Sequence, residues 1–333
     1  MQMTDFLSLL GGLALFLYGM QMMSSGLEAA AGSRMKQILE RLTANRFLGV
    51  LVGAAITAVI QSSSATTVMV VGFVNAGMMT LNQAVWIIMG ANIGTTVTGL
   101  LIALDVGELA PLIAFVGVVL AVFVKKPQLQ HVGQIFAGLG VLFIGMDMMS
   151  GAMAPLRESE AFVSIMSNFS NPLLGILAGM IFTAIIQSSS ASVGILQALA
   201  NSGVIAYANS VFVLFGQNIG TCITAVLASI GTTRNAKRTT IIHLMFNIIG
   251  TVIFTALFIL FPIASVIDGS LVLPGALGSF LSGVLPATPA GQIAITHTSF
   301  NIITTLLLLP LGNYLAKAAV KILPDRPEDK DER

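Results

Sequence analysis

The sequence is poor in charge. Only 9% of its 333 residues are Asp, Glu, Lys or Arg, whereas 56% are hydrophobic. A soluble domain of this size carries about a quarter charged residues, so most of this surface must face lipid rather than water. The formal net charge is +1, and no basic patch interleaved with aromatic residues appears, so we expect no nucleic-acid partner.

Cysteine is almost absent too. The only cysteine is Cys222, so an intrachain disulfide is excluded and cysteine usage does not indicate the redox compartment. The apolar stretch 6–18 has neither a basic segment before it nor a convincing cleavage site, so it does not read as a signal peptide. A copy of this stretch also recurs inside the chain, and we therefore expect it to be a span of the mature protein.

A duplication accounts for most of the chain. A shift of 126 residues aligns the sequence with itself, without gaps, from about residue 12 to residue 104. Residues 48–65 and 174–191 are identical at 12 of 18 positions, and each segment ends in Gln-Ser-Ser-Ser-Ala. We place repeat 1 at about 5–124 and repeat 2 at about 132–262. A smaller echo, His-x-x-Phe-Asn-Ile-Ile, begins at His243 and again at His297.

The apolar runs predict an all-α integral membrane protein. We expect about seven transmembrane helices, since a crossing needs roughly 20 apolar residues. They lie at 5–25, 82–104, 109–124, 132–151, 208–230, 239–262 and 292–316. The segments 47–79 and 172–206 differ, because each holds two arms of about 14 apolar residues around Gln-Ser-Ser-Ser. Such short arms favour two re-entrant hairpins over full crossings.

The basic residues give the expected orientation. With seven crossings, one face receives all but one of the 15 basic residues, and the other face receives only Arg157. The basic face is expected to be cytoplasmic in a multi-pass plasma-membrane protein, with the N-terminus outside and the C-terminus inside. An odd number of crossings separates equivalent points of the repeats, which are therefore inverted. We expect one transmembrane transport domain over 1–333, a surface helix at 26–46 and a solvated tail at 324–333.

The two hairpin tips carry the polar chemistry. Neither hairpin contains Asp, Glu, Lys, Arg or His. Hydroxyl groups both donate and accept hydrogen bonds, and a returning arm presents its N-terminal N–H groups to the tip. A tetrahedral oxyanion fits between two such tips. The candidate anion-binding residues are Gln61, Ser62, Ser63, Ser64, Gln187, Ser188, Ser189 and Ser190.

The tips alone hold an anion weakly. A helix end stabilises an anion by about 0.3–2 kcal/mol, whereas removing water from an ion costs several kcal/mol. A bound cation would supply the missing positive charge, and sodium suits hydroxyl, amide and carbonyl oxygens. The stretches Gly90–Gly94 and Gly216–Gly220 lie within spans and could unwind to offer carbonyls. Nearby side chains add Asn92, Thr95, Thr98, Asn218, Thr221 and Thr224 as candidate ligands.

Two copies of Gln-Ser-Ser-Ser, each followed about 30 residues later by Gly-x-Asn-Ile-Gly-Thr, resemble the type II sodium–phosphate cotransporter family over roughly residues 5–316. The resemblance implies sodium-driven uptake of inorganic phosphate by alternating access, with sodium as the coupling ion and no other cofactor. It implies a sodium site at Gln187, Ser188, Gln217, Thr221 and Thr224. Some bacterial relatives carry a PhoU-like domain after the last span, and we expect this chain to be a member without it.

Two other classes remain open. A transporter or channel for another oxyanion, or for a small carboxylate, would use the same hydroxyl groups. An intramembrane serine hydrolase would need a base beside Ser62–Ser64 or Ser188–Ser190, and none is near in sequence, so we expect no enzyme. His243 and His297 suit either a proton relay or a hydrogen bond to a neighbouring helix, and we favour the hydrogen bond. A homodimer is compatible with the sequence, which carries no interface signature.

Overall fold

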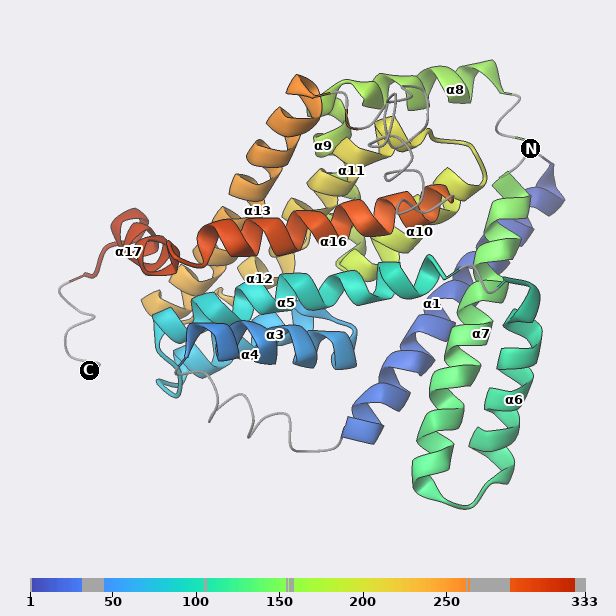
Figure 1. The fold of residues 1–333 in the computed structure, drawn as a ribbon, viewed down its shortest axis with the longest axis horizontal. Coiled ribbons are helices and arrows are strands. Elements are labelled where there is room, and N and C mark those ends of the chain that lie inside the picture. Colours follow the sequence, from blue (N-terminus) through green and yellow to red (C-terminus); the bar gives the residue numbers. More distant parts are fainter. Residues whose placement is uncertain are drawn as a thin grey trace, which may run out of the picture.

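The structure is a computed structural model that describes residues 2–31, 45–104, 107–153, 155, 159–261, 263 and 288–326. Within these ranges every regular element is helical (Figure 1). The first repeat contains α1 (Met3–Ala31), α3 (Arg46–Ile60), α4 (Ser63–Asn75), α5 (Leu81–Ile102), the 3-10 helix η1 (Gly107–Leu109) and α6 (Ala110–Phe123). The rest contains α7 (Pro127–Met153), α8 (Glu160–Ser167), η3 (Asn168–Ser170), α9 (Pro172–Ile186), α10 (Ser189–Asn201), α11 (Tyr207–Gly220), α12 (Cys222–Ala228), α13 (Arg234–Leu260), α16 (Pro289–Leu308) and α17 (Gly312–Ile322).

The helices are those of a membrane protein, as expected. Five segments of the described chain are long and apolar enough to cross a bilayer, and up to seven if each of two bent pairs is one span. The five segments are α1, α5, α7, the combined α11–α12 segment and α13. The bent pairs join residues 164–170 to α9 and α16 to α17, and they bend by 108° and 85°.

Two expected elements differ from the structure, and a third lies mostly outside its described part. The final span does not continue to residue 316, because α16 ends at Leu308 and the chain turns by 85° into α17. Pro310 lies in this turn, and proline cannot supply the N–H that a continuing helix needs. Helix α6 has only 14 residues, about 21 Å of rise, which is short of the ~30 Å hydrocarbon core. Of the surface helix expected at 26–46, residues 32–44 lie outside the described part.

Helices α3 and α4 double back on each other. A side chain at Gly49 would meet Trp86, and one at Gly94 would meet Thr57, so α3 and α5 run parallel. Helix α4 must therefore return the chain from the end of α3 to the start of α5. The same pattern holds for α9, α10 and α11, which are the equivalents at an offset of 126 residues.

The equivalent helices α1 and α7 pack against each other in opposite directions. Gly12 lies against Gly145, and Gly19 lies against Gly138, so the residue number falls along α7 as it rises along α1. Any side chain at these four positions would meet backbone atoms of the other helix. Small residues permit this close approach, which is common between membrane helices. Figure 1 shows α1, α6 and α7 grouped at one side of the molecule.

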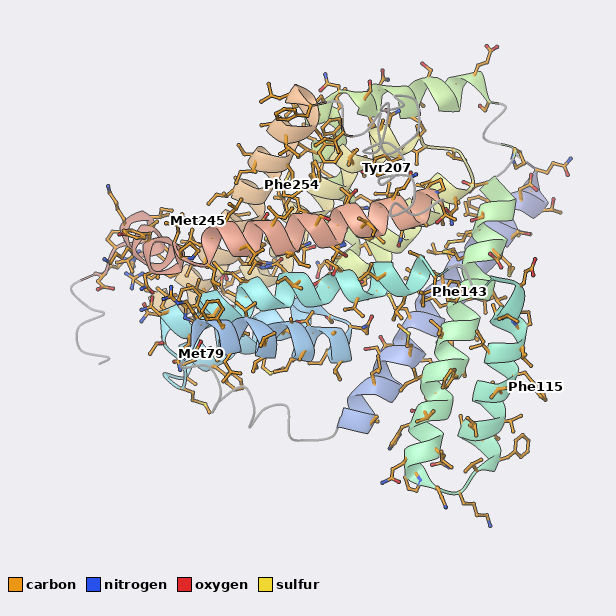
Figure 2. All side chains as sticks on the ribbon, viewed as in Figure 1. Met79, Phe115, Phe143, Tyr207, Met245 and Phe254 are labelled. Carbon is orange, nitrogen blue, oxygen red and sulfur yellow. The ribbon has the colours of Figure 1, made fainter. Side chains whose placement is uncertain are left out.

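The buried core links this group to the remaining helices. Phe16 and Phe143 are fully buried and share a cluster with Ile102 and Ala198, from α5 and α10. Phe115, by contrast, is 67% exposed on the outer side of α6, where Figure 2 shows it pointing away from the other helices. Exposed apolar side chains of this kind are those expected where a helix faces lipid.

Candidate functional site

Each Gln-Ser-Ser-Ser segment ends one helix and begins the next. Gln61 and Gln187 close α3 and α9 with a φ of +58°, and within the described residues only they and glycines have a positive φ. A left-handed conformation costs a non-glycine residue about 1–3 kcal/mol and is often kept at functional sites. Ser62 and Ser188 then cap α4 and α10 by accepting the N–H of the residue three positions on.

The two tips meet at the first residues of their returning helices. The hydroxyl oxygens of Ser63 and Ser189 lie 3.5 Å apart, and both side chains are buried. Both α4 and α10 therefore begin at the point of contact, and each helix presents its positive N-terminal end there. The structure thus brings together two segments that are 126 residues apart in the sequence.

Two further contacts join a serine of each tip to a threonine of the other repeat, and the repeat relates them to each other. The hydroxyl oxygens of Thr98 and Ser190 are 3.3 Å apart, and those of Ser64 and Thr224 are 3.2 Å apart. Adding 126 to Thr98 and to Ser64 gives Thr224 and Ser190, so each pair is the counterpart of the other. The duplication is therefore visible in side-chain contacts as well as in the sequence.

A cavity of about 130 Å³ lies between the tips. A single water needs about 10–15 Å³ of such space, so the cavity admits a larger solute. All eight candidate anion-binding residues line it, together with three residues of α1 that sequence reasoning missed: Met20, Gln21 and Ser24. The sequence signal that could have indicated Gln21 and Ser24 is their polarity inside an apolar span. Ser24 donates a hydrogen bond to the carbonyl of Ile60 at 2.5 Å.

The two tip glutamines occupy different environments. Gln61 is buried, its side-chain oxygen accepts the Thr98 hydroxyl at 2.5 Å, and its amide nitrogen donates to Ala58 of its own helix. Gln187 is exposed. The counterpart of Thr98, Thr224, has its hydroxyl 3.4 Å from the carbonyl of Thr221. The cavity lining therefore buries Gln61 and leaves Gln187 exposed.

Two of the candidate sodium ligands in the second repeat, Gln217 and Thr221, lie at the boundary between α11 and α12. Thr221 separates α11 from α12, and its hydroxyl donates to the carbonyl of Gln217. Gln217 is buried, and its amide nitrogen donates to the carbonyl of Ser192, whereas its amide oxygen has no hydrogen-bond partner. An unpartnered buried oxygen is costly unless another group, such as a cation, satisfies it.

The expected unwinding of the first repeat is wrong. Helix α5 continues without a break through Gly90–Gly94. These glycines serve close packing instead, because side chains at Gly90 and Gly94 would meet backbone atoms of Val50 and Ala54 in α3. The Gly216–Gly220 stretch is also helical and packs in the same way on α9, so the expected unwinding of the second repeat is wrong as well.

Two of the weaker candidates in the first repeat point to their own helix. The Thr95 hydroxyl donates to the carbonyl of Ala91, and the Asn92 amide donates to the carbonyl of Ile88. Neither residue lines the cavity between the tips. Asn92 also accepts a long hydrogen bond of 3.4 Å from Asn247 in α13.

The two histidines, His243 and His297, differ in their hydrogen bonding. A hydrogen bond of 2.9 Å joins His297 to Asn218 in the neighbouring helix α11, which confirms the favoured interpretation for this residue. The same expectation is wrong for His243, because both of its ring nitrogens are buried without a hydrogen-bond partner. Asn92, the counterpart of Asn218, bonds Asn247 instead. Equivalent polar groups thus make different contacts in the two halves.

Apolar helices that enclose a small, uncharged polar cavity between two duplicated tips are typical of membrane transport proteins. The sequence profile of the Na+/Pi-cotransporter family matches residues 15–151 and 156–273, and the chain belongs to this family. The family is one of transporters rather than enzymes. No solved structure matches the chain.

Curated relatives agree with this assignment. The chain is 33% identical to the protein YqeW of Bacillus subtilis, across 93% of this chain and 95% of YqeW. It is 26% identical to the "Putative inorganic phosphate export protein YjbB" of Escherichia coli, across 98% of this chain but only 57% of YjbB. A 103-residue segment is 37% identical to the human sodium-dependent phosphate transport protein 2B and covers 15% of that protein.

Proposed function

We propose that the protein carries inorganic phosphate across the membrane together with sodium, and that phosphate binds between the two Gln-Ser-Ser-Ser tips. The contact between Ser63 and Ser189, with the cavity beside it, carries this proposal. Membership of the Na+/Pi-cotransporter family supports phosphate and sodium as the solutes. The names of YjbB and of the human protein 2B both include phosphate, and the human name includes sodium dependence.

The proposed membrane placement is an inverted repeat with two re-entrant hairpins. In it, α3–α4 enters from one side and α9–α10 from the other, and the tips meet near the midplane. The antiparallel packing of α1 on α7 supports this placement, because equivalent helices of an inverted repeat must run in opposite directions. The basic face is cytoplasmic in this proposal, with the N-terminus outside.

Phosphate recognition then relies on dipoles and hydroxyl groups. The N-termini of α4 and α10 converge on the cavity, and the serine hydroxyls can turn to donate to phosphate oxygens. The residues that line the cavity include neither Lys nor Arg. A cation bound nearby would therefore provide the positive charge that a desolvated phosphate needs.

The proposed sodium site lies in the second repeat, at Gln187, Ser188, Gln217, Thr221 and Thr224. The buried amide oxygen of Gln217 supports it, because this oxygen has no hydrogen-bond partner and is available to a cation. The contact between Thr224 and Ser64 links these residues to the first tip. Sodium bound there would hold the second tip in position for phosphate, which makes the binding of the two solutes cooperative.

Alternating access is the proposed mechanism. The buried Gln61 and the exposed Gln187 support it. Because the two halves of the site are duplicated, a second state in which Gln187 is buried and Gln61 is exposed can be built from the same contacts. In that second state we expect Thr224 to bond Gln187 and Thr98 to release Gln61. The solutes would then face the opposite side of the membrane.

The proposed direction is uptake. Each charge moved against 100 mV costs about 2.3 kcal/mol, so a divalent phosphate costs about 4.6 kcal/mol. Two sodium ions cancel this charge, and a third makes uptake electrogenic. A sodium gradient directed inward would therefore drive phosphate inward.

Phosphate binding by the purified full chain tests the site. We expect labelled phosphate to bind with sodium present and to bind several-fold more weakly in potassium, and Ser63→Ala and Ser189→Ala to weaken it further. Ser229→Ala is the matched control, because its buried hydroxyl only bonds the carbonyl of Val226. Competition by arsenate, but not by sulfate or succinate, would support phosphate, and the reverse order would favour another anion.

A further inference from the structure

A second cavity, of about 460 Å³, lies where α4, α13 and the segment after α17 come together. Its lining includes three basic residues and no acidic one: Asn75, Gly231, Thr232, Thr233, Arg234, Lys237, Leu323 and Arg326. The cavity belongs to the basic face of the molecule and is separate from the cavity between the tips. Such a concentration of positive charge is suited to an anion.

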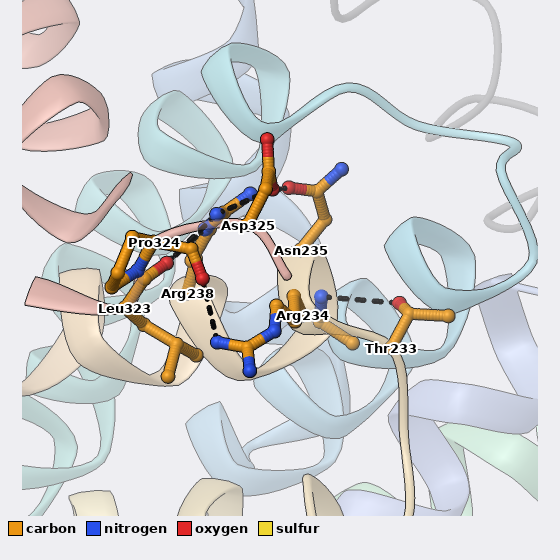
Figure 3. A network of polar contacts seen from close by, with 8 residues as sticks. Thr233, Arg234, Asn235, Arg238, Leu323, Pro324 and Asp325 are labelled. Carbon is orange, nitrogen blue, oxygen red and sulfur yellow. Dashed lines mark hydrogen bonds and ion pairs between the residues drawn. The ribbon is translucent and has the colours of Figure 1, made fainter. Parts of the chain in front are cut away.

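Arg238 holds one wall of this cavity in place. The residue is only 2% exposed, and its guanidinium donates to the carbonyl of Leu323, to Asn235 and, at 2.7 Å, to Asp325 (Figure 3). Arg234 donates to the carbonyl of Pro324 at 2.7 Å. These bonds fix residues 323–325 beside the start of α13 and so bring Arg326 to the cavity.

The opposite wall comes from the end of α4. The side-chain oxygen of Asn75 accepts the N–H of Thr233 at 2.8 Å, next to the first turn of α13. Helix α13 has 27 residues and begins at Arg234, so its positive end faces the same region. The cavity is therefore a built feature with three fixed sides.

Helix α17 places this cavity at the level of lipid headgroups. It leaves α16 at 85°, so it runs along the membrane surface if α16 crosses the membrane. Leu315 and Ala319 are buried against the protein, whereas Tyr314 and Ile322 are 66% and 60% exposed. An amphipathic helix with exposed aromatic and aliphatic side chains is typical of the interface between water and hydrocarbon. The cavity directly follows its C-terminal end.

We propose that this cavity binds the phosphate headgroup of an anionic phospholipid, with Arg234, Lys237 and Arg326 as its charged contacts. Basic pockets on the cytoplasmic side of membrane helices suit such headgroups. A bound headgroup bridges α4, α13 and the segment after α17, so it stabilises this end of the molecule. The cavity's position beside α17 favours a lipid over free phosphate, because the acyl chains of a lipid bound there lie along the apolar surface of the protein.

Native mass spectrometry of the full chain in neutral detergent tests the proposal. We expect phosphatidylglycerol to bind, phosphatidylcholine to bind much more weakly, and the double variant Lys237→Gln with Arg326→Gln to lose roughly fivefold in affinity for each charge removed. Lys125→Gln with Lys126→Gln removes two charges outside the cavity and should leave phosphatidylglycerol binding unchanged. Lys237→Gln alone repeats the test with a smaller change if the double variant is unstable.

Three results would overturn the proposal. The first is equal phosphatidylglycerol binding by the cavity variants and the native chain. The second is equal binding of phosphatidylcholine, which would mean that headgroup charge is not recognised. The third is complete displacement of phosphatidylglycerol by millimolar inorganic phosphate, which would identify a site for the free anion.

Discussion

At the scale of single residues, the tip glutamines illustrate how one sequence motif serves two environments. Gln61 and Gln187 share the same left-handed backbone and the same helix-ending role. They differ in burial and in the contact with the following threonine, Thr98 or Thr224. Since the local sequence is duplicated, the difference must come from the arrangement of the whole chain.

The proposed sodium site predicts a selective effect of two substitutions. Gln187→Ala and Thr221→Ala each remove an oxygen from the site, so the sodium concentration that half-activates phosphate transport should rise several-fold. Protein yield should change little, because neither change creates a large cavity. Uptake measured over a sodium series gives the result, with Ser229→Ala as the control. Native sodium activation in both variants would rule out this site.

The contact between the two tips predicts a reversible cross-link. In a Cys222→Ser background, Ser63→Cys and Ser189→Cys place two thiols where hydroxyl oxygens lie 3.5 Å apart, a separation that a small shift converts to a disulfide. Oxidation should stop phosphate transport, and a reducing agent should restore it. Each single cysteine variant is the control. A pair that does not cross-link in the membrane-embedded protein would contradict the tip-to-tip arrangement.

At the scale of helices, glycines set the distances between neighbours. A side chain at Gly53 would meet the carbonyl of Ile87, and one at Gly179 would meet the carbonyl of Val213. These two equivalent positions therefore serve close packing. Gly72, on α4, has no atom within 4 Å of the place where a side chain would begin.

Packing predicts opposite effects at these glycines. Gly53→Val forces α3 away from α5 and should lower the melting temperature clearly, since overpacking costs about 1–3 kcal/mol. Gly72→Ala meets open space and should be neutral or stabilising by up to about 1 kcal/mol, because alanine favours helix. Thermal unfolding in detergent compares the two. Equal melting temperatures would show that α3 and α5 are not packed as closely as the structure indicates.

The sequence could predict the helical membrane class and the helix breaks at the two Gln-Ser-Ser-Ser segments, because apolar runs and these duplicated segments are local signals. It could not predict the contribution of α1 to the cavity, since Ser24 reaches the tip only through tertiary packing. The glycines of α5 suggested unwinding because their packing partners in α3 are invisible in the sequence. The difference between His243 and His297 likewise depends on the state of the folded chain.

At the scale of the whole molecule, the repeat relates contacts as well as elements. The pairs Gly12–Gly145 and Gly19–Gly138 exchange when the repeats exchange, as do the hydroxyl contacts of the tip serines with Thr98 and Thr224. The tip glutamines break this relation, as do Asn92 and Asn218, which bond Asn247 and His297 respectively. A molecule that is symmetric in construction but asymmetric in contacts is the arrangement that alternating access requires.

The most direct measurement is uptake of radiolabelled phosphate into proteoliposomes that contain the purified full chain. We expect uptake when sodium is present outside, and little uptake when potassium or choline replaces it. Ser63→Ala and Ser189→Ala should each reduce sodium-driven uptake at least several-fold, whereas Ser229→Ala should not. Phosphate uptake that is equal in sodium, potassium and choline, from protein shown to be folded and inserted, would contradict sodium-coupled transport by this chain.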